Sequence, residues 1–119
     1  MGNERLMSAV QPASCEPFSL SVVPSAREVA VVAAGELDLA SGDVLERAVR
    51  QLYSCGVDRV VIDLRRVGFL SSTGLRVLLS LRNDAKRNGR SLTLVPGPAA
   101  VQRVFELTAT RGLFDWRDA

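Results

Sequence analysis

The 119-residue sequence contains no histidine, and this absence excludes several kinds of chemistry. Without an imidazole, neither a Ser-His-Asp nor a Cys-His nucleophilic arrangement can be assembled, and the commonest zinc ligand is missing. The two cysteines, Cys15 and Cys55, are too few for a disulfide framework and form no Cys-x-x-Cys pair. We expect both thiols to be reduced and without a role, although a redox-regulated bridge between them stays open.

Long apolar runs and a large net charge are also missing. No uninterrupted run approaches the ~18 residues of a membrane span, and the N-terminus lacks a basic segment followed by an apolar one. We therefore expect a cytoplasmic protein without a membrane span. The net charge is only +2, which does not indicate a basic surface for nucleic acid.

Acidic side chains are present, but their spacing is not typical of a catalytic site. Asp38 and Asp58 fall in expected turns, and Asp63 ends an expected strand. No acid–base pair and no phosphate-binding glycine loop of the GxxxxGK type occurs. We expect no catalysis, no cofactor and no metal site.

What the sequence does contain is enough apolar material, 47% of its residues, for one hydrophobic core. Residues 1–16 are small, polar and followed by Pro17, and we expect them to form a flexible N-terminal leader. Residues 17–119 are then expected to form a single domain.

Hydrophobic periodicity predicts alternating strands and helices in this domain. Strands are predicted at 18–22, 29–34, 59–64 and 91–95, helices at about 42–55, 72–88 and 99–108, and a short strand or docked end at 113–116. Ser41 is the predicted N-cap of the first helix, and Gly56 and Gly89 are predicted to end the first two. The order predicts an α/β fold with a mixed sheet of four to five strands and about three to four helices, opened by a hairpin and continued by right-handed parallel crossovers.

Three adjacent hydroxyls, Ser71, Ser72 and Thr73, stand where the second helix begins. A helix N-terminus has unpaired N–H groups and a partial positive charge, so it accommodates either a capping hydroxyl or a phosphate. At 100° per residue, Ser71 is best placed to cap. Ser72 projects onto a boundary with Arg76, while Thr73 points further into solvent. A phosphate on Ser72 would add roughly −1.5 to −2 charges and would repel an acidic partner.

Two motifs resemble a known family. Gly35-Glu36-Leu37-Asp38 and Asp63-Leu64-x-x-Val67-x-Phe69-Leu70-Ser71-Ser72-Thr73-Gly74-Leu75 are similar to the STAS domain of bacterial anti-sigma factor antagonists, and the similarity covers about residues 18–117. The family pattern before the helix reads Asp-Ser-Ser/Thr-Gly, with the first hydroxyl as phosphate acceptor. The resemblance implies that Ser72 is the acceptor. In this sequence Ser71 replaces the usual acid, so the capping role is kept but the negative charge is lost.

The resemblance implies a STAS fold and a partner-switching regulator of a bacterial stress response. The unphosphorylated protein would bind an anti-sigma factor that is also a serine kinase, phosphorylation of Ser72 would release it, and a serine phosphatase would reset the switch. An alternative is a STAS scaffold subunit of a larger signalling or lipid-transport assembly. The expected partner surface consists of Asp38, Ser71, Thr73, Arg76, Leu79, Ser80 and Asn83.

Overall fold

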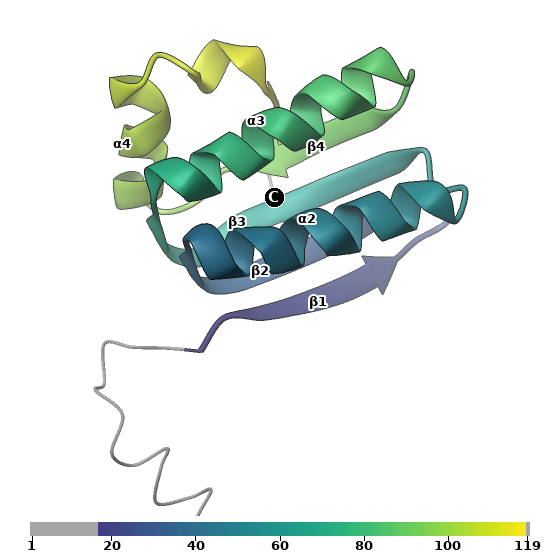
Figure 1. The fold of residues 1–119 in the computed structure, drawn as a ribbon, viewed down its shortest axis with the longest axis horizontal. Coiled ribbons are helices and arrows are strands. Elements are labelled where there is room, and N and C mark those ends of the chain that lie inside the picture. Colours follow the sequence, from purple (N-terminus) through teal and green to yellow (C-terminus); the bar gives the residue numbers. More distant parts are fainter. Residues whose placement is uncertain (1–16, 119) are drawn as a thin grey trace, which may run out of the picture.

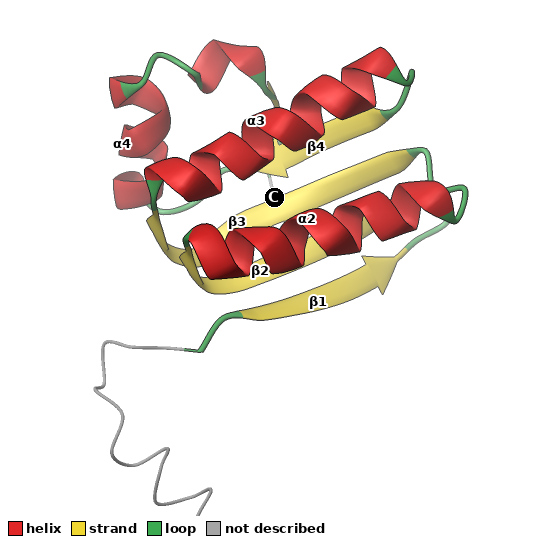
Figure 2. Cartoon of the chain, in the orientation of Figure 1, coloured by secondary structure: helices red, strands yellow, loops and turns green. Residues whose placement is uncertain are grey.

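The structure, a computed structural model, describes residues 17–118, so the predicted leader at 1–16 lies outside the described residues. Strands and helices alternate along this part of the chain, as Figures 1 and 2 show. In chain order the elements are β1 (Ser19–Pro24), β2 (Val29–Leu37), α2 (Leu39–Ser54), β3 (Arg59–Leu70), α3 (Ser72–Arg87), β4 (Ser91–Val95), α4 (Ala99–Leu107), the 3-10 helix η1 (Arg111–Leu113) and β5 (Asp115–Trp116).

The strands form one sheet in the order β1-β2-β3-β4-β5. β1 and β2 are antiparallel, and the other neighbouring pairs are parallel. This arrangement confirms the predicted mixed sheet with its opening hairpin. Because β2 and β3 are parallel and Leu37 pairs with Leu70, both strands end at the same edge of the sheet. The helices that follow them, α2 and α3, therefore begin beside each other (Figure 1).

The three α-helices and the sheet share a single hydrophobic core. Alternate residues of β2, Val31 and Ala33, are fully buried, whereas Ala30 before them and Val32 between them remain half-buried. This period of two indicates that one face of the strand carries the helices. The largest fully buried side chains come from strands and helices alike: Phe105, Leu37, Leu45, Ile62, Leu64, Leu78, Leu81 and Leu94.

The C-terminal residues dock through an aromatic cluster. The ring of Phe105 in α4 meets those of Phe114 and Trp116 edge to face, with centroids 5.5 and 5.0 Å apart. The Trp116 indole N–H donates to the main-chain oxygen of Arg111 at 2.8 Å. The predicted strand or docked end is thus a two-residue strand held by ring packing.

The predicted element order is confirmed, and most of the predicted boundaries lie within two residues of the observed ones. β4 has the predicted bounds, and Gly56 and Gly89 follow α2 and α3 with φ of +97° and +68°, the left-handed conformation expected where a helix ends. No helix within residues 17–118 has the length and apolar character to cross a bilayer.

The predicted ends of β2 at Ala34 and of β3 at Leu64 are wrong, because β2 continues to Leu37 and β3 to Leu70. Pairing with β2 resumes after an irregularity and runs through Leu70, and Val67 and Leu70 are buried. Arg65 therefore lies within a strand, where its guanidinium pairs with the Asp63 carboxylate at 2.7 Å. The six extra residues carry the chain to the edge where α3 starts.

Candidate functional site

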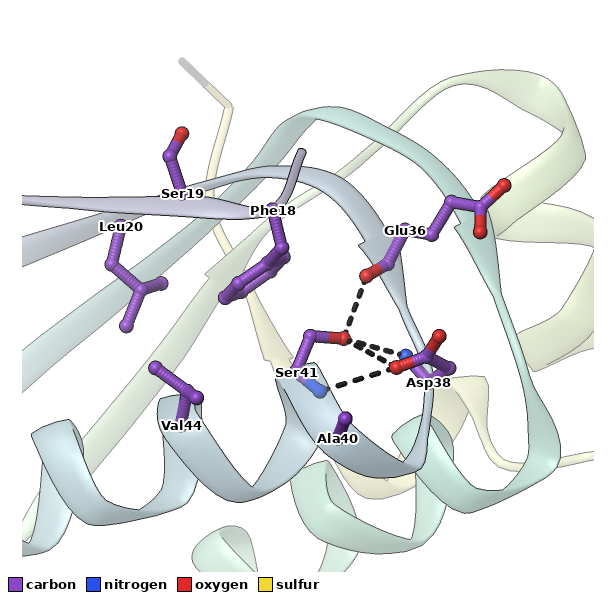
Figure 3. Close-up of a pocket in the computed structure, with 8 residues that line it drawn as sticks. All are labelled: Phe18, Ser19, Leu20, Glu36, Asp38, Ala40, Ser41 and Val44. Carbon is purple, nitrogen blue, oxygen red and sulfur yellow. Dashed lines mark hydrogen bonds between the residues drawn. The ribbon is translucent and has the colours of Figure 1, made fainter. Parts of the chain in front are cut away.

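The start of α2 is closed by a reciprocal pair of hydrogen bonds between Asp38 and Ser41 (Figure 3). The Ser41 N–H donates to Asp38 Oδ1 at 3.1 Å, and the Asp38 N–H donates to Ser41 Oγ at 2.8 Å. The Ser41 hydroxyl in turn donates to the Glu36 carbonyl oxygen at 2.6 Å. The predicted cap is therefore wrong in its residue: Asp38 is the N-cap, Ser41 is the third helical residue, and the helix begins three residues earlier than predicted.

These bonds also set the charge of Asp38. The Ser41 N–H, and after it the Ser41 hydroxyl, lower the pKa of the Asp38 carboxyl below its ordinary value of 3.8. Asp38 is thus a carboxylate at neutral pH, with one oxygen committed to the start of α2.

The start of α3 is closed by Ser71, as the sequence predicted. Ser71 Oγ accepts from the Gly74 N–H at 3.0 Å, and the Ser71 N–H donates to the Leu37 carbonyl oxygen at 3.0 Å. Its hydroxyl also lies 2.9 Å from Thr73 Oγ1. Ser71 therefore caps the helix and fastens it to the end of β2.

Gly74 allows this close approach. A Cβ added to Gly74 would lie 2.4 Å from the Leu37 carbonyl oxygen and 3.0 Å from the Leu70 side chain. No side chain fits at that distance, so the first turn of α3 can sit on the end of β2 only with glycine at this position. The requirement for glycine at this position of the hydroxyl motif is therefore steric.

Ser72 is the hydroxyl that these contacts leave free. Ser72 is exposed, whereas Ser71 and Thr73 are half-buried. No hydrogen bond between residues 17–118 uses the Ser72 hydroxyl. The prediction that Thr73 points furthest into solvent is wrong, because its hydroxyl turns back to Ser71.

The electrostatic setting of Ser72 favours an anion. The first turn of α3 contains no acidic residue, and Ser72 is the first residue of the helix, where the helix dipole is positive. Arg76 lies one turn further along and is exposed. Arg76 forms no ion pair with any of residues 17–118, so its guanidinium is available.

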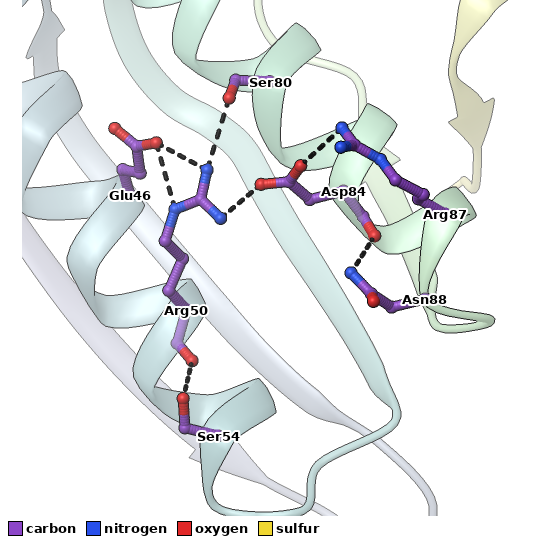
Figure 4. Close-up of polar contacts among 7 residues, drawn as sticks. All are labelled: Glu46, Arg50, Ser54, Ser80, Asp84, Arg87 and Asn88. Carbon is purple, nitrogen blue, oxygen red and sulfur yellow. Dashed lines mark hydrogen bonds and ion pairs between the residues drawn. The ribbon is translucent and has the colours of Figure 1, made fainter.

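The remaining predicted partner residues follow α3 away from Ser72. Leu79 is half-buried against the core, and Asn83 is exposed and accepts from Arg82 at 2.9 Å. Ser80 accepts from Arg50 of α2 at 3.3 Å (Figure 4). At 1.5 Å per residue, Ser80 lies about 12 Å along the helix from Ser72, so these residues adjoin the site without forming its centre.

The sequence reading missed the apolar side chains around this edge. Leu39 is 71% exposed and Phe69 is 51% exposed. The register pairs Phe69 with Glu36 near the ends of β3 and β2, and Leu39 is the first residue of α2, so both side chains lie near the edge of the sheet where α2 and α3 begin. Phe69 is an apolar residue that belongs to neither a predicted strand nor a predicted helix, and such a residue can signal an exposed contact surface. It was passed over because it fell in a segment predicted to be a loop.

A groove of about 410 Å³ lies between the start of β1 and the start of α2 (Figure 3). Its walls include Phe18, Leu20 and Val44, together with Asp38 and Glu36. It adjoins the closed start of α2, so the accessible edge continues from Ser72 past Asp38 to an apolar hollow.

Another of the acidic residues considered from the sequence, Asp63, has a structural partner. The side-chain hydrogen bonds from Arg65 lower the pKa of its buried carboxyl, and the Arg65 N–H also donates to it at 3.0 Å. Within residues 17–118, no three His, Cys, Asp or Glu side chains gather closely enough to hold a metal ion.

Comparison with known proteins identifies the family to which this fold belongs. The family described as "Mlab, STAS domain" matches residues 21–114. The anti-sigma-B factor antagonist of Bacillus subtilis is 30% identical over 98 residues, 82% of this chain and 89% of that protein.

Two solved structures share the fold. An anti-sigma factor antagonist from Mycobacterium paratuberculosis matches with a TM-score of 0.78 at 23% identity and covers 92% of both chains. The phosphorylated form of the Bacillus cell fate determinant SpoIIAA matches with a TM-score of 0.66 at 18% identity, covering 87% of this chain and 91% of that one. The chain therefore belongs to the STAS domain family, and its relatives include anti-sigma factor antagonists.

Proposed function

We propose that this protein is an anti-sigma factor antagonist that switches partners through Ser72. Unphosphorylated, it binds an anti-sigma factor that is also a serine kinase; phosphorylated at Ser72, it is released. The relatives' names support the general role of a regulatory binding protein and not that of an enzyme. The observation that carries the proposal is the exposed hydroxyl of Ser72, which bonds to none of residues 17–118, beside a separate cap, Ser71.

Ser71 caps the helix and Ser72 does not, so a modification of Ser72 can be added and removed without breaking the cap. In the proposed step the kinase transfers the γ-phosphoryl group of ATP to Ser72 Oγ, the hydroxyl proton is lost, and ADP leaves. The cap bond from the Gly74 N–H to Ser71 Oγ is not broken by this step. The new phosphate would lie at the positive end of α3 within reach of Arg76, so the fold gains rather than loses favourable contacts.

The surroundings of Ser72 explain why the same phosphate would weaken partner binding. Exposed Phe69 and Leu39 offer apolar contact area to a partner, because the buried centre of a protein interface is more apolar than its rim and is enriched in aromatic side chains. A phosphate on Ser72 adds a dianion to the edge of the sheet near which both side chains lie, and this dianion would have to lose its water when a partner docks over that edge. Asp38 and Glu36 nearby add further negative charge. A serine phosphatase would hydrolyse the phosphate ester and restore the binding surface.

Binding measurements with the cognate anti-sigma kinase test this proposal. We expect Ser72→Ala to bind with nearly unchanged affinity and to accept no phosphate, and Ser72→Asp to bind at least about tenfold more weakly. Thr73→Val is the matched control, since it alters the neighbouring hydroxyl that already bonds to Ser71. Phosphate mapped to a residue other than Ser72, or equal calorimetric affinities for Ser72→Asp and the unchanged protein, would reject the switch.

A further inference from the structure

The edge strand β1 has no partner on its outer side within residues 17–118. It pairs with β2 alone, and five of its six residues are exposed. Val22 and Val23 are 49% and 52% exposed. An edge strand of this kind presents a row of unpaired N–H and C=O groups to solvent.

The usual protections of a sheet edge are largely missing from β1. The strand Ser19–Pro24 carries no charged side chain, and its six residues pair with β2 without a bulge. The opposite edge differs: β5 has only two residues, one of them Asp115, and Arg117 follows it directly. Short length and charge protect β5, whereas only Pro24, at its very end, interrupts the edge of β1.

We propose that two copies of this chain pair antiparallel through β1 and form one continuous sheet across a two-fold axis. The side chains of β1 are self-complementary in such a pairing. With Ser21 opposite Ser21 of the second copy, Leu20 faces Val22 of the second copy, and Val22 faces Leu20 in return. Leu20 and Val22 lie on the face of the sheet that carries the helices, because they pair with Ala33 and Val31. The pairing therefore buries apolar side chains against one another.

Charge at the two ends of β1 favours a second copy over an unrelated extended segment. Arg27 stands in the turn after β1, and Glu36 stands beyond the start of β1 on the neighbouring strand. Both residues are exposed, and neither forms an ion pair within residues 17–118. Antiparallel pairing brings the Arg27 end of each copy toward the Glu36 end of the other, so opposite charges meet twice.

The geometry also sets the strength of the dimer and its relation to Ser72. A strand pair about 20 Å long is a small interface, so the dimer is expected to be weak and in the micromolar range. The two Ser72 edges lie at opposite ends of the joined sheet, because the strands run in opposite directions. The tests of the dimer measure self-association and not phosphate transfer, so the dimer and the proposed switch can each fail alone.

Sedimentation velocity of the full chain from about 1 to about 500 μM tests the proposal. We expect the sedimentation coefficient to rise with concentration, and Val22→Lys to weaken self-association by at least about tenfold. Leu107→Lys is the matched control, because Leu107 is 75% exposed on α4, away from β1, and should leave association unchanged. A folded protein that stays monomeric over the whole range, or association that Val22→Lys does not weaken, would overturn the proposal.

A cross-linking experiment tests the register. Ser21→Cys is made in a Cys15→Ser, Cys55→Ser background, with Leu107→Cys in the same background as control. Residues directly opposite in an antiparallel pair are close enough for a disulfide. We expect mild oxidation to convert the Ser21→Cys protein to a covalent dimer well before the control. Equal rates for both proteins would reject pairing through β1, including the case in which residues 1–16 cover the strand instead.

Discussion

The starts of α2 and α3 meet the same physical requirement in two different ways. Each helix follows a parallel strand, each begins at the same edge of the sheet, and each has N–H groups that need an acceptor. At α2, Asp38 and Ser41 use their polar groups on each other. At α3, Ser71 alone supplies the cap, and the next hydroxyl, Ser72, is left exposed.

The difference shows how a helix start becomes available for regulation. The start of α2 is closed, since Ser41 is buried and both of its polar atoms have partners. The start of α3 has one more hydroxyl than capping requires. A group that does no structural work can change its charge without changing the fold, and at α3 that group is Ser72.

The largest expected effect comes from filling the contact that seats α3 on β2. Gly74→Ala would place a Cβ 2.4 Å from the Leu37 carbonyl oxygen, so the backbone must shift. We expect the free energy of unfolding to fall by about 3 kcal/mol or more, measured by urea denaturation. Gly68→Ala is the control, because a Cβ at Gly68 meets nothing within 4 Å. Similar losses in both variants would show that the close contact is not what holds α3 in place.

A smaller effect should separate the two serines of α3. Ser71→Ala removes the cap and should cost about 1 kcal/mol of unfolding free energy. Ser72→Ala removes a hydroxyl without a partner and should change stability by less than about 0.5 kcal/mol. Thermal denaturation of both variants is the measurement. If Ser72→Ala destabilised the protein as much as Ser71→Ala, the contrast between a structural and a spare hydroxyl would be lost.

The sequence predicted the element order because strands and helices have different hydrophobic periods, and those periods are set by burial of one face. It placed the cap of α3 correctly because nothing competes with Ser71 for the Gly74 N–H. It misplaced the cap of α2 because both Asp38 and Ser41 are good caps, and only the fold shows that the two act together. It ended β3 too early because the arginine pair breaks the apolar run.

The exposed apolar residues of the site were beyond the reach of sequence patterns. Leu39 and Phe69 are the same residue types that fill the core, and their exposure depends on where β2 and β3 end relative to each other. The register, with its irregularities in β2, is set by tertiary pairing. Hydroxyls at a helix start can be recognised from local sequence, whereas the surface around them cannot.

The hydrogen bonds of Asp38 at the start of α2 should make the stability of the protein depend on pH. The pKa of Asp38 is lowered in the folded state, so its carboxylate contributes stability above its ordinary pKa of 3.8, and this contribution is lost as the pH falls through the lower folded value. Asp38→Asn keeps an acceptor but loses the charge. We expect the variant to melt at a lower temperature than the unchanged protein at pH 7, and the two melting temperatures to draw together as the pH falls below 3.8. A difference that stays constant with pH would mean that the charge of Asp38 plays no part in the cap.

Only a small effect is expected from the ion pairs that join the two helices further along. Arg50 of α2 pairs with Glu46 on its own helix and with Asp84 of α3 (Figure 4). These bonds, first to Glu46 and then to Asp84, raise the pKa of Arg50. Its side chain is 43% exposed, however, and exposed ion pairs contribute less than about 1 kcal/mol.

We therefore expect Arg50→Met to lower the unfolding free energy by less than about 1 kcal/mol, and by still less in high salt. Arg47→Met is the matched control, because among residues 17–118 Arg47 pairs only with Asp43 of its own helix and does not connect the two helices. Urea denaturation at low and high salt measures both. A loss for Arg50→Met as large as that for Gly74→Ala would mean that charge, and not close contact at the sheet edge, sets the two helix starts side by side. The exposure of Ser72 would then depend on ionic strength, which the seating of Gly74 on Leu37 argues against.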